Sequence, residues 1–145
     1  MKNGYWRWQN IFSFAVIGLT FAFLCMIAVC MLWPYQTATV KDVHTLTPIV
    51  KVGEEAVFEF TYDKKTSHSA DFSIGLANHS TYNVASGTVD SPEGIYTTQK
   101  SIIIPPEVAP GEYRIRVTMK YKVNPIRTIA VEFETEDTFE VLGNE

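Results

Sequence analysis

The sequence contains only two cysteines, Cys25 and Cys30, and none after them. On a helix, residues five apart point about 140° away from each other, so these two form neither a disulfide nor a shared metal site. The remainder of the chain therefore has no disulfide scaffold and no thiolate-bound zinc. Tryptophan is absent after Trp33. The tryptophan and the disulfide that mark a true immunoglobulin domain are therefore both absent, which favours a generic sandwich over such a domain.

Charge is absent from the stretch between Ile11 and Leu32, which also lacks His, Asn and Gln. As a helix this stretch would span about 33 Å, close to the roughly 30 Å hydrocarbon core of a bilayer. A signal peptide has an apolar region of only about 7 to 15 residues before a small-x-small cleavage site. Thr37-Ala38-Thr39 matches such a site poorly. We therefore expect a retained transmembrane helix over residues 11–33, with a cleaved signal peptide as the alternative.

Aromatic residues flank this predicted helix on both sides. Trp6 and Trp8 precede it, and Trp33 and Tyr35 follow it, as in the aromatic belts at the two membrane interfaces. Within the helix, Gly18 and Ala22 share one face with the small-xxx-small spacing that allows two helices to pack closely. The sequence thus predicts membrane-interface positions and a candidate helix-packing face.

The distribution of charge predicts an orientation. Lys2 and Arg7 precede the helix with no acid among the first ten residues, whereas Lys41 beyond it is followed by Asp42. The positive-inside rule then places residues 1–10 in the cytoplasm and the carboxy-terminal part in the periplasm or outside the cell. Ten basic and sixteen acidic residues follow Trp33, a net charge of −6, which argues against nucleic-acid binding.

After the helix, residues 34–47 show no strong period and are predicted to be a linker. Residues 48–142 then alternate between apolar and polar in short runs, as in Ala56–Tyr62, and 143–145 form a tail. Tyr82 and Val84 suggest a short edge strand before a turn-rich stretch at 86–94. Seven or so strands predict an all-β, two-sheet sandwich of immunoglobulin-like (fibronectin-like) type.

The last part of the chain predicts a long hairpin. Apolar residues alternate with polar ones from Tyr113 to Val123 and again from Ile129 to Phe133, on either side of a turn at Asn124-Pro125. If both apolar rows face inward, Arg116 lies opposite either Glu134 or Glu136. Either register matches opposite charges on the outer face, so these charges have a structural explanation.

The pattern of Tyr121, Asn124-Pro125-Ile126-Arg127, Thr135-Glu136 and Phe139-Glu140-Val141 resembles that of small bacteriophage-encoded single-pass membrane proteins with a β-rich, immunoglobulin-like domain. The resemblance covers about the last forty residues and the overall layout. It implies a phage or prophage origin and a bacterial inner membrane, and it supplies no catalytic residue.

Catalytic motifs are not found in the sequence. His44, His68 and His79 are not spaced as neighbours on one strand or helix face, and no Gly-x-Ser-x-Gly, phosphate-binding glycine loop or His-Glu-x-x-His occurs. We therefore expect no catalytic residue, no cofactor and no metal site.

These observations together predict a bilayer-anchored, non-catalytic module that binds a protein or an envelope component outside the cytoplasm. The alternative is a structural virion or membrane-assembly component that self-associates in a virion membrane or a cell membrane. An envelope hydrolase is the least favoured function. Sandwich loops are common contact surfaces. The candidate contact residues are Lys64, Lys65, His68, Asp90, Glu93, Asn124 and Arg127.

Overall fold

The computed structural model describes residues 3–78 and 81–143, with side chains from residue 10 onward. The predicted interface side chains of Trp6 and Trp8, and the whole of His79, lie outside the described residues. The chain divides into two compact units. One contains the chain up to Tyr35 together with Asn124–Arg127, and the other contains 36–123 and 128–145.

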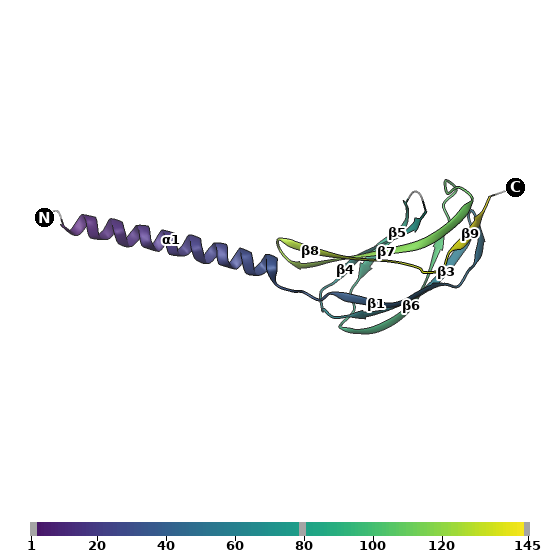
Figure 1. Ribbon diagram of the computed structural model, residues 1–145, viewed down its shortest axis with the longest axis horizontal. Helices are drawn as coiled ribbons and strands as arrows, with labels where there is room; N and C mark the ends of the chain where they lie inside the picture. The colour runs from purple at the N-terminus through teal and green to yellow at the C-terminus, as the bar shows by residue number, and fades with distance from the viewer. Residues whose placement is uncertain (1–2, 79–80, 144–145) are drawn as a thin grey trace. The chain divides into compact units, whose positions relative to one another are not determined.

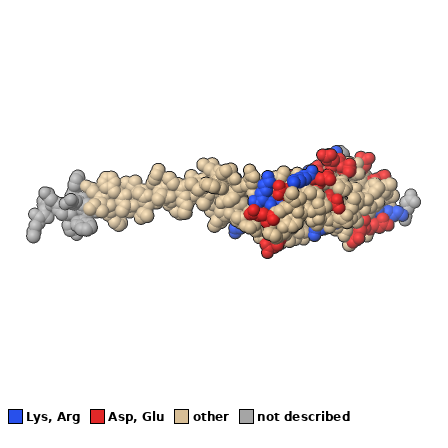
Figure 2. All heavy atoms as spheres, turned by 90° about the horizontal axis from the view of Figure 1, so that it is seen from below, with Lys and Arg blue, Asp and Glu red and all other residues tan. Residues whose placement is uncertain are grey.

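Helix α1 (Asn3–Leu32) confirms the predicted apolar helix and extends it toward the N-terminus. Its segment Asn10–Leu32 is long and apolar enough to cross a membrane, and none of that segment is buried within the described protein. Figure 2 shows the Lys, Arg, Asp and Glu side chains gathered over the β-strand region, with none on the described side chains of α1. A signal sequence near the N-terminus can pass the same test of length and composition, so the helix is an apolar segment suited to either role.

The described part of the chain after α1 forms nine β-strands. They are β1 (Ala38–Thr45), β2 (Ile49–Lys51), β3 (Glu55–Lys64), β4 (Ala70–Ala77), β5 (Thr81–Val89), β6 (Gly94–Ile103), β7 (Gly111–Asn124), β8 (Arg127–Glu134) and β9 (Phe139–Leu142). This confirms the predicted fold class of one apolar helix followed by an all-β region.

The strands form two sheets. The smaller has the order β1-β3-β6, and the larger has the order β2-β9-β7-β4-β5, with β8 also paired to β7. Figure 1 shows β1 and β6 in the lower layer and β4, β5 and β7 in the upper layer. This two-layer arrangement is compatible with an immunoglobulin-like sandwich.

The core lies between the sheets, because alternate residues of a strand point to opposite faces. On β3 the inward row contains Phe58, Phe60 and Tyr62, whose rings stack with centroid distances of 5.9 and 5.5 Å. The predicted inward row of β7 is confirmed: Tyr113, Ile115, Val117, Met119, Tyr121 and Val123 are all buried.

A tyrosine fixes the start of β7. The Tyr113 hydroxyl donates a hydrogen bond to the Ala109 carbonyl at 2.8 Å, and the ring packs near Phe139. Gly111, two residues earlier, has φ +151°, a backbone conformation that favours glycine. Burial, with a smaller contribution from Tyr82, raises the pKa of Tyr113. The hydroxyl therefore stays protonated at neutral pH and serves as a structural donor.

The predicted linker over residues 34–47 is wrong for most of its length. Residues 38–45 form β1, which pairs antiparallel with β3. The pairing contains an irregularity between Val40 and Asp42, which interrupts the alternation of side chains. Because of that interruption, residues 38–45 do not show the apolar–polar alternation by which a strand is predicted.

The turn-rich stretch predicted at 86–94 is also partly wrong, because β5 continues to Val89 against β4. Gly87, which suggested a turn, allows a close approach of the two strands. A Cβ atom there would lie 2.8 Å from Cε1 of the Phe72 ring. Glycine in this strand therefore makes room for an aromatic neighbour.

Candidate functional site: a cleft beside the closing hairpin

The candidate site is an open cleft of about 480 Å³ in the β-sandwich unit. Its walls come from the end of β4, the start of β7, the end of β8 and the segment before β9. It is lined by Ala77, Asn78, Glu112, Tyr113, Arg114, Arg116, Glu134 and Thr138. The strand alternation that buries Tyr113 and Ile115 turns Glu112, Arg114 and Arg116 to the outer face, where they form one charged row.

Arg116 and Glu134 form an ion pair in this cleft. The Arg116 Nε donates to Glu134 Oε1 at 2.7 Å, and Nη2 lies 2.5 Å from the same oxygen. The opposite-charge pairing predicted for the hairpin is confirmed in the register that faces Arg116 with Glu134. Both side chains are more than one-third exposed, so the pair contributes at most about 1 kcal/mol to stability.

Arg114 differs from Arg116 in having no partner among the described residues. It is exposed, and no described residue forms a hydrogen bond or ion pair with its guanidinium. The Glu112 carboxylate on the same face is likewise without a described partner. Within the described part of the chain, the cleft therefore offers a free cation and a free anion beside a neutralised pair.

Buried polar groups hold the walls of the cleft in place. Thr135, only 1% exposed, accepts a hydrogen bond from the Ile115 backbone N–H at 3.1 Å and donates to the Asp137 carbonyl at 2.8 Å. Across the cleft, Asn78 Nδ2 donates to the Glu112 carbonyl at 2.8 Å. These bonds connect β7 to the segment before β9 and to the end of β4, so the charged row projects from a fixed surface.

Lys64, predicted as a contact residue in a loop, is instead a buried part of β3. It is 1% exposed, and its ammonium donates to the Ser91 carbonyl. It follows Tyr62 in the inward row because β3 continues two residues beyond the predicted strand end. Lys64 is therefore unavailable to a partner.

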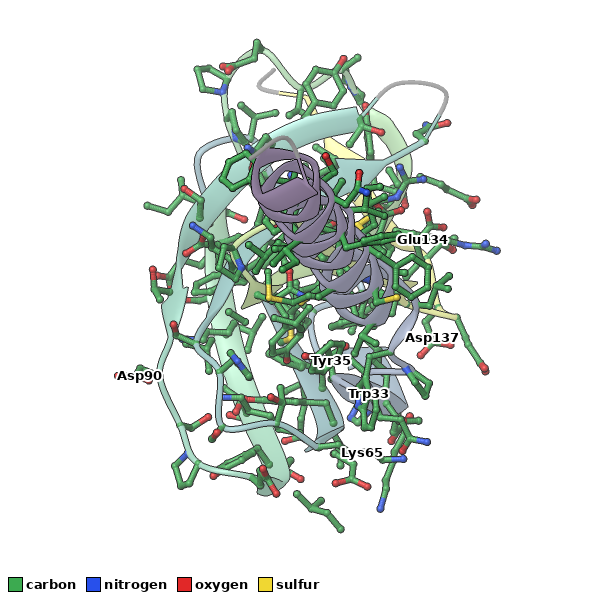
Figure 3. The ribbon with its side chains drawn as sticks, turned by 90° about the vertical axis from the view of Figure 1, so that its left-hand side faces the viewer. Trp33, Tyr35, Lys65, Asp90, Glu134 and Asp137 are labelled. Atoms are coloured by element: carbon green, nitrogen blue, oxygen red, sulfur yellow. The ribbon has the colours of Figure 1, made fainter. Side chains whose placement is uncertain are left out.

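The other predicted contact residues of the sandwich unit are exposed but do not converge. Lys65 and His68 lie in the loop after β3, and Asp90 and Glu93 lie in the loop after β5. Figure 3 shows Asp90 on the opposite flank of the domain from Glu134 and Asp137. These loops therefore lie apart from the cleft.

Asn124 and Arg127, the remaining predicted contact residues, belong to the same compact unit as α1. Within that unit, Asn124 Nδ2 donates to the Cys30 carbonyl at 2.8 Å, and Arg127 Nη1 donates to the Trp33 carbonyl at 2.6 Å. The Arg127 guanidinium also lies 5.9 Å from the centre of the Tyr35 ring. Asn124 thus donates to one of the last carbonyls of α1, which have no partner within the helix, and Arg127 donates to the carbonyl of the residue that follows the helix.

The predicted helix-packing residues make no close contact within the described chain. A Cβ atom added to Gly18 would meet nothing within 4 Å, and Ala22 is exposed. The helix-packing face stays a prediction.

A histidine between two carboxylates was not predicted. His44 Nδ1 lies 3.4 Å from Asp42 Oδ2, and Nε2 lies 3.7 Å from Glu59 Oε1. The prediction missed this cluster because it treated His44 as part of a linker. Among the described residues, no group of three or more His, Cys, Asp or Glu has a geometry that could hold a metal ion.

No family model and no curated protein matches the sequence. Among solved structures, the DNA glycosylase AlkC of Pseudomonas fluorescens aligns at 10% identity and TM-score 0.44, over 79% of this chain and 33% of its own. A CARDB domain from Pyrococcus furiosus aligns at 17% identity and TM-score 0.43, over 75% of this chain and 95% of its own. A β-glucosidase from Listeria innocua aligns at 15% identity and TM-score 0.41, over 76% of this chain and 16% of its own. The chain thus spans about a third of the glycosylase it matches, and likeness at this level carries no functional conclusion.

Proposed function

We propose that this protein is a membrane-anchored, non-catalytic binding module whose β-sandwich engages another protein outside the cytoplasm. The observation that carries the proposal is the combination of an apolar helix with a β-sandwich that has an open, charged cleft. In this proposal α1 holds the chain in a bacterial inner membrane, and the sandwich is displayed on the far side.

The proposed orientation rests on Lys2 and Arg7 before the helix. Alkaline phosphatase fused after Glu145 should be active, because that enzyme requires an oxidising compartment, whereas β-galactosidase fused at the same place should be inactive. The reverse pattern in these two fusions would contradict the orientation.

The cleft is the proposed binding surface because Arg114 and Glu112 have no described partners while the neighbouring side chains are fixed. Pre-organised charged groups in a cleft give specificity, since an unmatched partner leaves them desolvated and unpaired. A protein segment that presents a carboxylate to Arg114 and a cation or amide to Glu112 would satisfy both.

A photoreactive amino acid in place of Thr138, which lines the cleft, tests this proposal in intact cells. We expect a discrete adduct with another protein, and we expect Arg114→Glu to reduce its yield at least about tenfold, as for a lost charge pair worth about 1.4 kcal/mol.

Lys122→Glu is the matched control, because Lys122 lies on the same outer row of β7 but does not line the cleft. An adduct that Arg114→Glu and Lys122→Glu reduce equally would contradict binding in the cleft. No adduct at Thr138 would contradict it as well.

A further inference from the structure

Strand β6 forms one edge of the smaller sheet. It pairs with β3 on one side, and in the described part of the chain no strand pairs with its other side. It lies at the lower margin of the domain in Figure 1. An unpaired edge presents a row of free backbone N–H and C=O groups, which is a template for a further strand.

The β6 edge lacks most of the features that protect sheet edges. Its ten residues pair with β3 without a break in register, and none of them is proline. Its only charged residue is Lys100, which is exposed and whose Nζ lies 5.7 Å from the centre of the Phe72 ring. Bulges, prolines and charged side chains, lysine above all, are the common means of blocking edge pairing, and Lys100 is the single such feature on β6.

The other described edges carry such protection. The pairing of β1 with β3 is irregular between Val40 and Asp42, and the pairing of β5 with β4 is irregular between Ile74 and Gly75. Strand β2 has only three residues, and β8 carries two glutamates. Strand β6 is therefore the edge best suited to accept a further strand.

The sequence of β6 is complementary to itself. Ile95 and Ile103 are 61% and 64% exposed, and each lies four residues from Gln99. An antiparallel pair of β6 strands related by a twofold axis at Gln99 places each Ile95 opposite Ile103 of the other copy. The same register sets Thr97 opposite Ser101 and Lys100 opposite Thr98. No like charges face each other, and two isoleucine pairs are formed.

We propose that two copies of this chain associate by antiparallel pairing of their β6 strands about Gln99, which joins the two small sheets into one. Identical edges related by a twofold axis run antiparallel, and the facing of Ile95 with Ile103 sets the axis at Gln99. A single strand pair buries little surface, and confinement of both chains in one membrane would raise their effective concentration. This surface is separate from the cleft, so pairing does not depend on the cleft's binding a partner.

Disulfide trapping tests the proposed register in native membranes. In the full chain with Cys25 and Cys30 replaced by alanine, Gln99→Cys should give a covalent homodimer on mild oxidation. Directly opposite residues of an antiparallel pair have Cβ atoms about 4.5–5.5 Å apart, near the separation that a disulfide needs.

Thr39→Cys is the control, because Thr39 is exposed at the start of β1, near the beginning of β6, where Gly94 and Ala38 both pair with Lys64. In the antiparallel pair the two copies of this end lie about 33 Å apart. The Gln99→Cys dimer should therefore be several-fold more abundant. Equal trapping at both positions would indicate association through another part of the chain and would overturn the proposal.

Charge substitutions at the isoleucines test the register independently. In the Gln99→Cys chain, Ile95→Lys with Ile103→Lys places like charges opposite each other and should abolish trapping. Ile95→Lys with Ile103→Glu places opposite charges together and should restore it. Both side chains are exposed, so the melting temperature should not change. Ile49→Lys, at another exposed isoleucine, should leave trapping unchanged.

Three further outcomes would overturn the proposal. They are trapping that survives both lysines, failure of the Lys–Glu combination to restore it, and a disulfide that joins the Gln99→Cys chain to a different protein instead of to a second copy.

Discussion

Lys64→Glu is expected to destabilise the β-sandwich by roughly 3–5 kcal/mol, a large share of the roughly 5–15 kcal/mol by which an ordinary domain is stable. Lys64 is 1% exposed, and its ammonium donates to the Ser91 carbonyl. Glutamate would place a carboxylate beside that carbonyl oxygen and remove the donor that the lysine supplies to it. A buried charge that loses its partner is among the most costly changes in a core.

Two substitutions separate the effect of charge from that of shape. Lys64→Met keeps an unbranched chain in the same space but leaves the Ser91 carbonyl without its donor, so we expect a loss of about 1–3 kcal/mol. Lys65→Glu changes the exposed neighbour and should cost less than about 0.5 kcal/mol.

The measurement for these variants is denaturant unfolding of the full chain in detergent, followed by far-ultraviolet circular dichroism. Tryptophan fluorescence would not report on the sandwich, because the last tryptophan is Trp33. A Lys64→Glu variant as stable as Lys65→Glu would show that the lysine is not buried.

The second large effect is expected in the apolar helix. Leu19→Arg together with Leu24→Arg should release the chain from the membrane. Each arginine near the centre of a span costs about 2.5–3.5 kcal/mol and each leucine contributes about −0.5 kcal/mol, so the pair costs roughly 6–8 kcal/mol. Both leucines are exposed along α1, so no fold within the described chain depends on them.

Leu19→Met together with Leu24→Met is the matched control, because methionine keeps the helix apolar. The measurement is the fraction of chain that stays in the membrane pellet after alkaline carbonate extraction. Retention of the double-arginine variant at the level of the double-methionine variant would contradict a bilayer-spanning role for α1.

The sequence predicted the helix and those strands whose own order of apolar and polar residues is typical of such an element. The apolar run of α1 has no charged or amide side chain that would suggest another structure. Strand β7 alternates without interruption because one of its faces is buried along most of its length. Strand β3 was predicted for the same reason. The Arg116–Glu134 pair was predictable because inward-facing apolar rows allow few registers.

Other elements could not be predicted because they depend on contacts with residues far away in the sequence. Strand β1 forms because it pairs with β3. Gly87 fits within β5 because the Phe72 ring fills the space that a side chain at position 87 would need. Lysine is among the residues least often buried, so nothing local distinguished Lys64 from Lys65.

The cleft was missed for a similar reason. Asn78, Arg114 and Thr138 are separated in sequence and come together only when β4, β7 and β9 assemble.

Cell fractionation of the unmodified protein tests the central claim, that α1 stays in a bilayer and holds the sandwich beside it. Mass spectrometry should find the intact, uncleaved chain in the carbonate-resistant membrane pellet. Recovery of the same uncleaved chain in the detergent-free supernatant, or of a sandwich cleaved from its helix, would contradict the account.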